Sequence, residues 1–399
     1  MKRFLSMAVA MGFCLTLVSG VSAGDDSGIP SWLKDVNFKG KFRIRAEKLR
    51  NDNQPGNFLR DRNRLRYLAR YGFDFRPDEG LKIGFRVGSS GTTGAQPGVG
   101  SQFVTMDDGF RDDPLYVDLA YASYWPGVFP ALGMEITAGK FNNPYTSTGI
   151  IWDSDIGPEG IYVKLVPPSL KSHKISLTSG YLVLQENNSG GGGTTASGIQ
   201  IGRDAYGLAH QINAGGLMIG SIEMSGWATL YNWIRPSLTQ LAQANMAFGN
   251  NSNDGNRYTS EFNIIDVGLK ASYDVIGYPA SLTFNYMKND NAVANPGTGK
   301  VEDRGMVLKS TLGKIEMKGD WAIKSVWSRI ETDALLAFLM DATYFSVGST
   351  NYEGYAIGLT YALTDHSTIA VNFYDSEEEN KAGADPDQQT LQINYSVSF

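Results

Sequence analysis

The sequence predicts an all-β fold: a transmembrane antiparallel β-barrel of about 16 strands, with short periplasmic turns and long external loops. Three observations lead to this prediction. Apolar and polar residues alternate with a period of two, the connections alternate between short and long, and no apolar run after the N-terminal segment is long enough for a membrane helix. The longest such run, 334–340, has seven residues, whereas a membrane-spanning helix needs about 20.

The alternation is clearest in three consecutive segments, 36–45, 62–76 and 81–88. Phe38 and Ile44 share one face of the first segment, and its other face is basic. Because successive side chains of a strand point to opposite faces, each segment is predicted to have one apolar side and one strongly charged side. We expect a basic wall that lines the lumen, formed by Lys39, Lys41, Arg43, Arg45, Arg62, Arg64, Arg66, Arg70, Arg76 and Arg86.

The same pattern continues along the chain with varying clarity. It predicts thirteen further strands at 115–125, 134–141, 161–166, 174–185, 204–213, 217–231, 260–275, 278–288, 304–312, 319–330, 353–363, 368–375 and 389–399. The long connections are 49–60, 89–114, 142–158, 186–203, 232–259, 289–303, 331–352 and 376–388. The short ones are 77–80, 126–133, 167–172, 214–216, 276–277, 313–318 and 364–367. Such regular segregation is typical of a membrane barrel and is not required of a soluble sandwich or propeller.

The first 23 residues are predicted to be a cleaved signal peptide. Lys2 and Arg3 form a basic start, residues 7–18 are mostly apolar, and small residues follow at the expected cleavage site. A short segment, 24–35, then precedes the barrel, which is expected to span 36–399. The chain is therefore expected to be exported to the outer membrane.

The composition argues against several classes of function. The single cysteine, Cys14, rules out a disulfide framework, and with only three histidines a metal site built from Cys or His is not expected. The net charge of −6 argues against a nucleic-acid partner, which usually requires a strongly basic surface. We expect no cofactor and no metal.

Two patterns are near catalytic or metal motifs but are better explained as loops. Residues 250–261 carry polar side chains near the spacing of a calcium-binding loop, but no predicted helices flank them. Asp365, His366 and Ser367 are adjacent in a short turn, so their side chains cannot converge as a nucleophile and its base. We expect that the protein is not an enzyme.

The last predicted strand resembles the C-terminal strand of bacterial outer-membrane proteins. Its apolar residues alternate with polar ones, and the sequence ends on Phe399. In those proteins the final phenylalanine is recognised by the outer-membrane assembly machinery. The resemblance implies that Phe399 is an assembly signal.

Several motifs resemble those of the putative-porin family of proteobacterial outer membranes. They are RDRNRLRY at 60–67, GKFNNP at 139–144, WDSD at 152–155, PEG at 158–160, KGDW at 318–321, and the segment 331–363. The resemblance extends over essentially the whole chain after the predicted signal peptide. It implies an outer-membrane porin, a water-filled channel for passive diffusion of small hydrophilic solutes and ions. The implied partners are membrane lipid and the assembly machinery, and general porins suggest a homotrimer.

The charges are unevenly distributed along the sequence. Residues 38–86 carry a local charge of +8, and residues 101–160 carry one of −7. The porins that the chain resembles set strand arginines against acidic residues of an inward-folded third external loop. The corresponding candidate acids here are Asp153, Asp155 and Glu159.

Two alternatives to this constriction remain open. The basic residues could simply solvate a wet interior, or they could form a saturable site in a channel that selects anions, phosphate or carboxylates. The apolar run 334–340 is predicted to be a short helix or a hydrophobic plug within a long loop. It is expected to pack either into the mouth of the barrel or against a neighbouring subunit.

Overall fold

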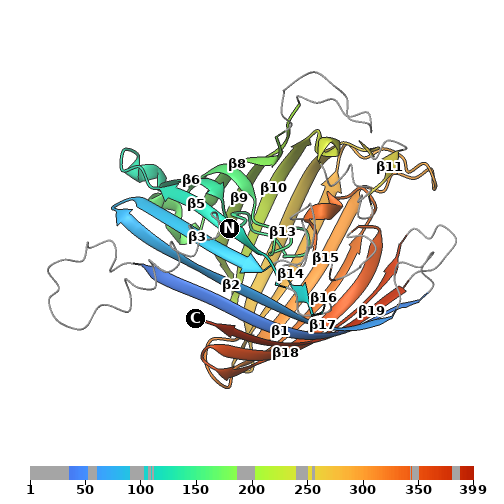
Figure 1. Ribbon diagram of the computed structural model, residues 1–399. Coiled ribbons are helices and arrows are strands. Elements are labelled where there is room, and N and C mark those ends of the chain that lie inside the picture. Colours follow the sequence, from blue (N-terminus) through green and yellow to red (C-terminus); the bar gives the residue numbers. More distant parts are fainter. Residues whose placement is uncertain are drawn as a thin grey trace. The chain divides into compact units, whose positions relative to one another are not determined.

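Sixteen strands, together with the short strand β4 (Val104–Thr105), form one antiparallel sheet that closes on itself (Figure 1). The sixteen are β1 (Asn37–Asp52), β2 (Arg62–Asp78), β3 (Leu81–Ser89), β5 (Leu115–Tyr124), β6 (Met134–Lys140), β7 (Glu159–Leu165), β8 (Ser176–Gln185), β9 (Ala205–Ile219), β10 (Ile222–Ile234), β13 (Phe262–Val275), β14 (Tyr278–Asn289), β15 (Arg304–Gly313), β16 (Trp321–Ile330), β17 (Tyr352–Thr364), β18 (Ser367–Glu378) and β19 (Asp387–Ser398). A separate hairpin joins β11 (Ser252–Asn253) to β12 (Arg257–Tyr258).

The computed structural model describes residues 36–52, 61–89, 103–106, 109, 112–186, 203–239, 250–253, 257–341, 343, 350–379 and 387–399. Asn37–Phe399 forms one unit. The predicted signal peptide at 1–23 and the segment 24–35 lie outside the described residues.

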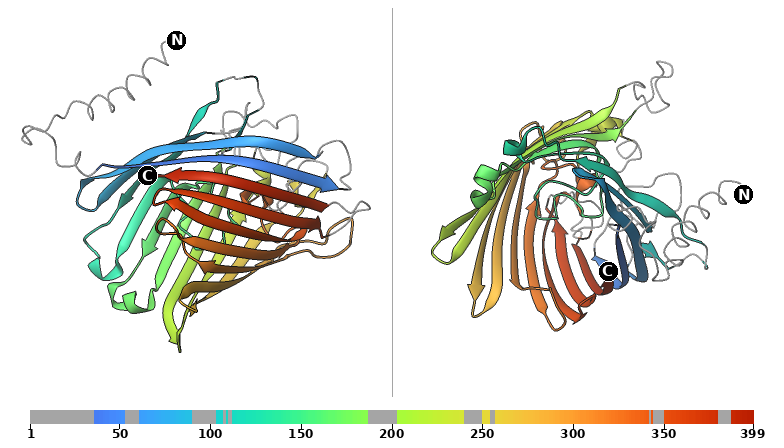
Figure 2. Two further views of the ribbon diagram at one scale, coloured as in Figure 1. Left: turned by 90° about the horizontal axis from the view of Figure 1, so that it is seen from below. Right: turned by 90° about the vertical axis from the view of Figure 1, so that its left-hand side faces the viewer.

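The barrel closes because β1 pairs with both β2 and β19. The β1–β19 register runs from Lys41 opposite Ser398 to Asp52 opposite Asp387. At the end of this seam, the amide of Gly40 donates to the carbonyl of Phe399 at 2.9 Å, and the amide of Phe399 donates back at 3.1 Å. Figure 2 shows the first and last strands side by side. Closure pairs the first strand with the last, so that neither of them presents an open sheet edge to lipid.

The two faces of the sheet differ in polarity, as the period of two predicts. Leu269 of β13 and Leu359 of β17 are 55 % and 50 % exposed on the outer face. On β19, the side chains of Gln392 and Asn394 are buried on the inner face. Such a barrel presents apolar side chains to lipid and polar side chains to its lumen. No described helix has both the length and the apolar character needed to cross a membrane.

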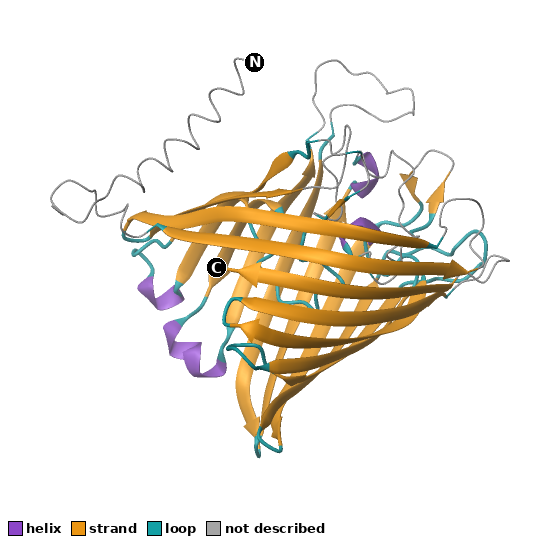
Figure 3. Ribbon diagram, turned by 60° about the horizontal axis from the view of Figure 1, so that its bottom comes forward, coloured by secondary structure: helices purple, strands orange, loops and turns teal. Residues whose placement is uncertain are grey.

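The helical pieces of the described chain are short 3₁₀ turns. They are η1 (Pro130–Leu132), η2 (Pro168–His173), η3 (Pro236–Leu238) and η4 (Ala337–Leu339). The first two contact each other at the end of the barrel where the short turns lie (Figure 3). We call this the short-turn end and the opposite one the long-loop end.

All sixteen predicted strands are present, but one predicted turn is wrong. Residues 214–216 do not connect two strands, because β9 runs on to Ile219 and the turn follows at Gly220. Gly216 has a φ of 74°, and the register shifts between Met224 and Gly226 on the partner strand. The glycines therefore form a bulge in a long hairpin, which needs the same left-handed backbone freedom as a turn.

Candidate functional site

The third long loop, residues 141–158, folds into the barrel. The Tyr145 hydroxyl donates to the carbonyl of Ala209 on β9 at 3.2 Å. Further along the loop, the Thr148 hydroxyl lies 3.3 Å from Asn285 Oδ1 on β14, and Lys309 of β15 donates to the Thr148 carbonyl at 3.1 Å. These contacts reach inward-facing positions on three strands, so the loop crosses the lumen (Figure 2). We call it the third loop.

An aromatic cluster anchors the third loop to the wall. The ring of Trp152 lies 6.4 Å from that of Tyr231 and 6.1 Å from that of Trp233, both on β10. Tyr145 meets Tyr231 edge to face, with ring centroids 5.9 Å apart. All four side chains are buried. Burying aromatic rings of this size is a large apolar contribution, so this side of the lumen is filled rather than open.

The apolar run 334–340 packs inside the barrel against the third loop. Its seven side chains are all buried, and six of them, all but Ala337, belong to the same apolar cluster as Ile150, Ile151 and Trp152. The amide of Asp153 donates to the carbonyl of Leu339 at 2.7 Å, and the amide of Asp341 donates to that of Ile150 at 3.1 Å. Of the two expected positions, the structure therefore shows packing into the barrel.

Residues of the motif at 250–261 hold the loop that contains the apolar run 334–340. The side-chain amide of Asn250 donates to the carbonyls of Thr332 and Leu335, each at 2.7 Å. Asn251 and Ser260 both donate to the carboxylate of Asp333. The polar residues that are near calcium-loop spacing therefore hold one external loop against another.

The basic wall contains cross-strand pairs of like charge. Lys41 of β1 stands directly opposite Arg70 of β2, and Arg45 stands directly opposite Arg66. Directly opposed like charges destabilise an antiparallel pair. The stability of the wall therefore depends on carboxylates that neutralise these charges.

Glu47 is the first of these carboxylates. It is 5 % exposed on the inner face of β1 and forms an ion pair with Arg64. Its other oxygen lies 3.8 Å from both Arg45 Nη1 and Arg66 Nη1, and it accepts a hydrogen bond from Gln392 at 3.0 Å. One buried carboxylate thus serves three guanidinium groups.

Asp118 and Asp155 neutralise Arg70 and Arg86 of the basic wall. Asp118 on β5 accepts from Arg86 and lies 3.5 Å from Arg70 Nε. Asp155, on the third loop, accepts from Arg70 Nη2 at 2.6 Å. Arg86 also reaches Asn142 Oδ1, at the start of the third loop, at 3.4 Å. The third loop is therefore tied electrostatically to the basic wall.

The ring of Phe103 lies against Arg43, Arg45 and Arg66 of the basic wall. The guanidinium carbon of Arg45 is 3.9 Å from its ring centroid, and those of Arg66 and Arg43 are at 5.3 and 5.6 Å. Arg66 also donates to the Phe103 carbonyl at 3.2 Å. Cation–π contacts of this kind favour a positive charge on an aromatic face.

The remaining predicted wall residues have separate surroundings. Arg43 donates to Ser396 Oγ at 3.1 Å. Lys39 pairs with Asp74 at 2.5 Å near the short-turn end. Arg62 is exposed where β2 begins, and Arg76 is exposed where β2 ends, over the ring of Trp125. Arg62 and Arg76 therefore stand at opposite ends of the strand rather than in its middle.

Two of the three candidate acids lie near the wall. Asp155 binds Arg70 as described. Asp153 lies next to Asp155, because Asp153 Oδ1 accepts a hydrogen bond from the Asp155 amide at 2.8 Å. Glu159 instead starts β7 and pairs with Lys140 at 2.7 Å. The structure therefore does not bring Glu159 to Arg70 as it does Asp155.

Sequence reasoning missed four members of this site. Glu47 and Asp118 occupy inward positions in alternating strands, so the face on which they lie was a usable signal. Phe103 and Asp341 lie in long connections, where the period of two carries no information about position.

Asp153 is partly buried beside two other carboxylates. Burial, together with the negative charges of Asp341 and Asp155, raises the pKa of Asp153 to about 8. Burial likewise raises the pKa of Asp341. A carboxyl with a raised pKa is neutral below that pKa and charged above it, so this site gains negative charge as the pH rises.

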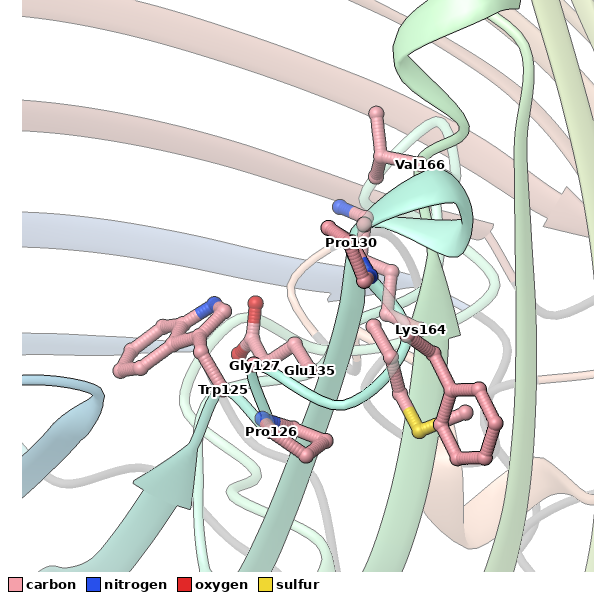
Figure 4. A pocket seen from close by; sticks show the side chains of 10 residues that line it. Trp125, Pro126, Gly127, Pro130, Glu135, Lys164 and Val166 are labelled. Carbon is pink, nitrogen blue, oxygen red and sulfur yellow. The ribbon is translucent and has the colours of Figure 1, made fainter.

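Other chemistry is not evident in the described residues. Within them, no group of three or more His, Cys, Asp or Glu side chains is arranged to hold a metal ion. A cavity of about 440 Å³ opens at the short-turn end, lined by residues that include Trp125, Pro130, Glu135 and Lys164 (Figure 4). Glu135 there accepts from the hydroxyl of Tyr162 at 2.9 Å.

Trp152→Ala should loosen the third loop. Removing a buried tryptophan side chain costs about 3–5 kcal/mol, so the loop should lose its attachment to β10. We expect larger and noisier single-channel currents in planar bilayers. Trp327→Ala is a matched control, because Trp327 lies on the opposite face of β16 from the buried inner residues. Identical currents in Trp152→Ala and the wild-type protein would contradict this role.

The ion selectivity should depend on pH through Asp153. Below pH 7 the wild type and Asp153→Asn should have the same reversal potential in asymmetric salt, because Asp153 is then neutral. Above pH 8 the wild type should shift towards cations relative to the variant. If the two proteins follow one pH curve, Asp153 does not ionise within reach of the permeating ions.

The comparisons with known proteins agree with this geometry. The sequence model of the family described as putative porin matches residues 52–184 and 236–399. No curated protein matches the chain.

Three solved structures illustrate the structural similarity. The high-pH structure of Pseudomonas putida OprB has 12 % sequence identity and a TM-score of 0.55, with 92 % of this chain and 94 % of that chain covered. Salmonella typhi OmpF in complex with daunomycin has 14 % identity and a TM-score of 0.48, with coverage of 91 % and 97 %. A mutant of Rh. blastica porin has 11 % identity and a TM-score of 0.46, with coverage of 91 % and 100 %.

The likeness to OprB shows the fold alone, whereas the family match covers most of the sequence. The closed 16-strand barrel and the family match lead to the same conclusion. The chain belongs to the putative-porin family, and it is an outer-membrane β-barrel that forms a porin-like channel rather than an enzyme.

Proposed function

We propose that the protein passes small hydrophilic solutes and ions by diffusion, with a moderate preference for anions. The path runs through the part of the lumen that the basic wall and the third loop border. In this proposal residues 1–23 are a signal peptide that is cleaved on export, and the long loops face the outside of the cell.

The observation that carries the proposal is the imbalance of charge at the inner face. The cationic side chains there are Lys41, Arg43, Arg45, Arg64, Arg66, Arg70 and Arg86. They outnumber the carboxylates Glu47, Asp118 and Asp155 that neutralise them. Within the described residues, no carboxylate lies within ion-pair distance of Lys41 or Arg43.

The acids of the third loop decide how strong the preference is. A wall without opposing carboxylates would select anions strongly, whereas an equal number of opposing carboxylates would leave only a transverse field. Asp155 reaches the wall and Glu159 does not, so the geometry supports an intermediate case. A unit charge at 4 Å is worth about 4 kcal/mol at an effective dielectric constant of about 20, which biases permeation even after screening by salt.

Changing Arg66 and Arg70 together to Gln should move the reversal potential towards cations. Both side chains are on the inner face of β2, and Arg70 holds the third-loop carboxylate. We expect the cation-to-anion permeability ratio to rise roughly 3- to 10-fold at about 0.1 M salt, and less at high salt. The measurement is the reversal potential across a planar bilayer with asymmetric KCl.

A matched control removes two cations elsewhere. Lys288 and Arg304 lie at the long-loop ends of β14 and β15, beside Asp290 and Asp303. Lys288→Gln with Arg304→Gln should shift the ratio much less. An unchanged reversal potential and conductance in the Arg66 and Arg70 variant would mean that these arginines do not line the narrow part.

The proposed partners are membrane lipid, the outer-membrane assembly machinery and two further copies of the chain in a homotrimer. For assembly, the supporting observation is the exposed ring of Phe399, which lies over Gly40 of β1. A Cβ atom at position 40 would lie 2.2 Å from that ring. The glycine thus makes room for the terminal aromatic side chain.

Deleting Phe399 should lower the amount of folded barrel in the outer membrane without preventing export. The deletion removes the proposed assembly signal and both backbone hydrogen bonds to Gly40. Folded barrel can be measured by its faster migration on unheated gels. Phe399→Tyr keeps the ring and should be close to the wild type. Normal levels of folded barrel after the deletion would refute the assembly role.

A further inference from the structure

Three lysines form a second basic group inside the barrel, across the lumen from the basic wall. Lys270 lies on β13, Lys309 on β15 and Lys324 on β16. In the closed order of the sixteen strands, β13 is half a turn away from β2. The chain neighbours Leu269 and Leu308 are exposed on the outer face, which places the lysines on the inner face. We call Lys270, Lys309 and Lys324 the lysine cluster.

The strand register brings the three side chains together. Lys270 and Lys309 both pair with Thr283 on the strand between them, so they share one row of the sheet. Lys309 also pairs with Val326, and Lys324 lies two residues before that valine, which makes Lys324 a diagonal neighbour. The charges of Lys324 and Lys270 act on Lys309 electrostatically.

The lysine cluster differs from most of the basic wall in having no ion pair: Glu223 of β10, a diagonal neighbour of Lys270, pairs with Lys174 instead. Among the described residues, no carboxylate lies within ion-pair distance of any of its three members. Lys309 donates to the carbonyl of Thr148 on the third loop at 3.1 Å. Lys270 and Lys324 are exposed to the lumen. Grouped cations repel one another, so an anion from solution would relieve this repulsion.

The surroundings of the lysine cluster offer hydroxyl groups. Thr283 stands between Lys270 and Lys309, and Ser225 of β10 pairs with Lys270 from the other side. Gly358 of β17 pairs with Lys324, and the side-chain oxygen of Asn372 lies where a Cβ atom at position 358 would be. Hydroxyl groups between ammonium groups suit an oxyanion, which accepts hydrogen bonds at several oxygen atoms.

We propose that the lysine cluster binds small doubly charged oxyanions, such as hydrogen phosphate or a dicarboxylate, as they cross the lumen. The inference rests on the proposed function, because a solute reaches the cluster only through an open channel. Two negative charges fit better than one, since a monovalent anion leaves most of the positive charge of the cluster uncompensated. The cluster would make passage of such solutes saturable.

The test is block of chloride current by added anions in planar bilayers at pH 7.5. The probes are inorganic phosphate, succinate and, as a monovalent comparison, acetate. We expect phosphate and succinate to reduce the current with saturation, and acetate to act only at much higher concentration. If both dianions act, charge is the determinant, whereas block by one alone assigns the site to phosphate or to dicarboxylates.

The diagnostic variant is Lys270→Gln with Lys324→Gln, which leaves the bond between Lys309 and the third loop in place. The half-blocking concentration should rise roughly tenfold, which corresponds to about 1.4 kcal/mol. Lys270→Arg with Lys324→Arg should keep the block, because it keeps both charges. Lys82→Gln is the control, since Lys82 lies beside Asp74 at 3.3 Å and that carboxylate keeps its second partner, Lys39.

The results separate this inference from the proposed function. The lysine site alone is overturned if phosphate blocks the wild type and the Lys270 and Lys324 variant equally. In that case the channel must still be open and still respond to the changes at Arg66 and Arg70. Block by acetate as strong as that by phosphate also overturns it. Failure of the purified barrel to conduct ions would instead overturn the proposed function.

Discussion

Pairing between the first and last strands is the constraint on which the rest of this structure depends. In lipid, an unpaired backbone amide or carbonyl is costly, so a membrane sheet must close. The β1–β19 register closes it, and Gly40 and Phe399 finish the seam with two reciprocal hydrogen bonds. Closing sixteen strands produces a wide lumen, whereas eight strands would be filled by their own side chains. The long loops therefore have an interior that they can narrow.

The interior is divided into an apolar side and a charged side. On the apolar side, Trp152 and the run 334–340 pack against aromatic residues of β10. On the charged side, Lys41 opposes Arg70 and Arg45 opposes Arg66, an arrangement that is unfavourable without compensation. Glu47, Asp118, Asp155 and the ring of Phe103 supply it. The contact of Asp155 with Arg70, which offsets part of this repulsion, also holds the third loop in place.

The fold could be predicted from the sequence more completely than the site could. Alternation with a period of two is a local property, so all sixteen strands and the inner face of β1 and β2 follow from it. The error at 214–216 arose because a glycine with a positive φ suits a bulge as well as a turn. The site depends on contacts between distant segments, such as Asp155 with Arg70 and Asp153 with Leu339. No pattern within one strand indicates which loop charge reaches which wall residue.

The clamp between residues 150–153 and 339–341 has a consequence for the order of assembly. Its two backbone hydrogen bonds join segments nearly half the chain apart. The third loop therefore cannot take its final position until the loop after β16 has entered the barrel. A partly inserted chain that ends at β16 holds the basic strands but lacks the segment that fastens the loop across them. The crossing of the lumen by the third loop is thus completed by a segment that lies nearly half the chain later in the sequence.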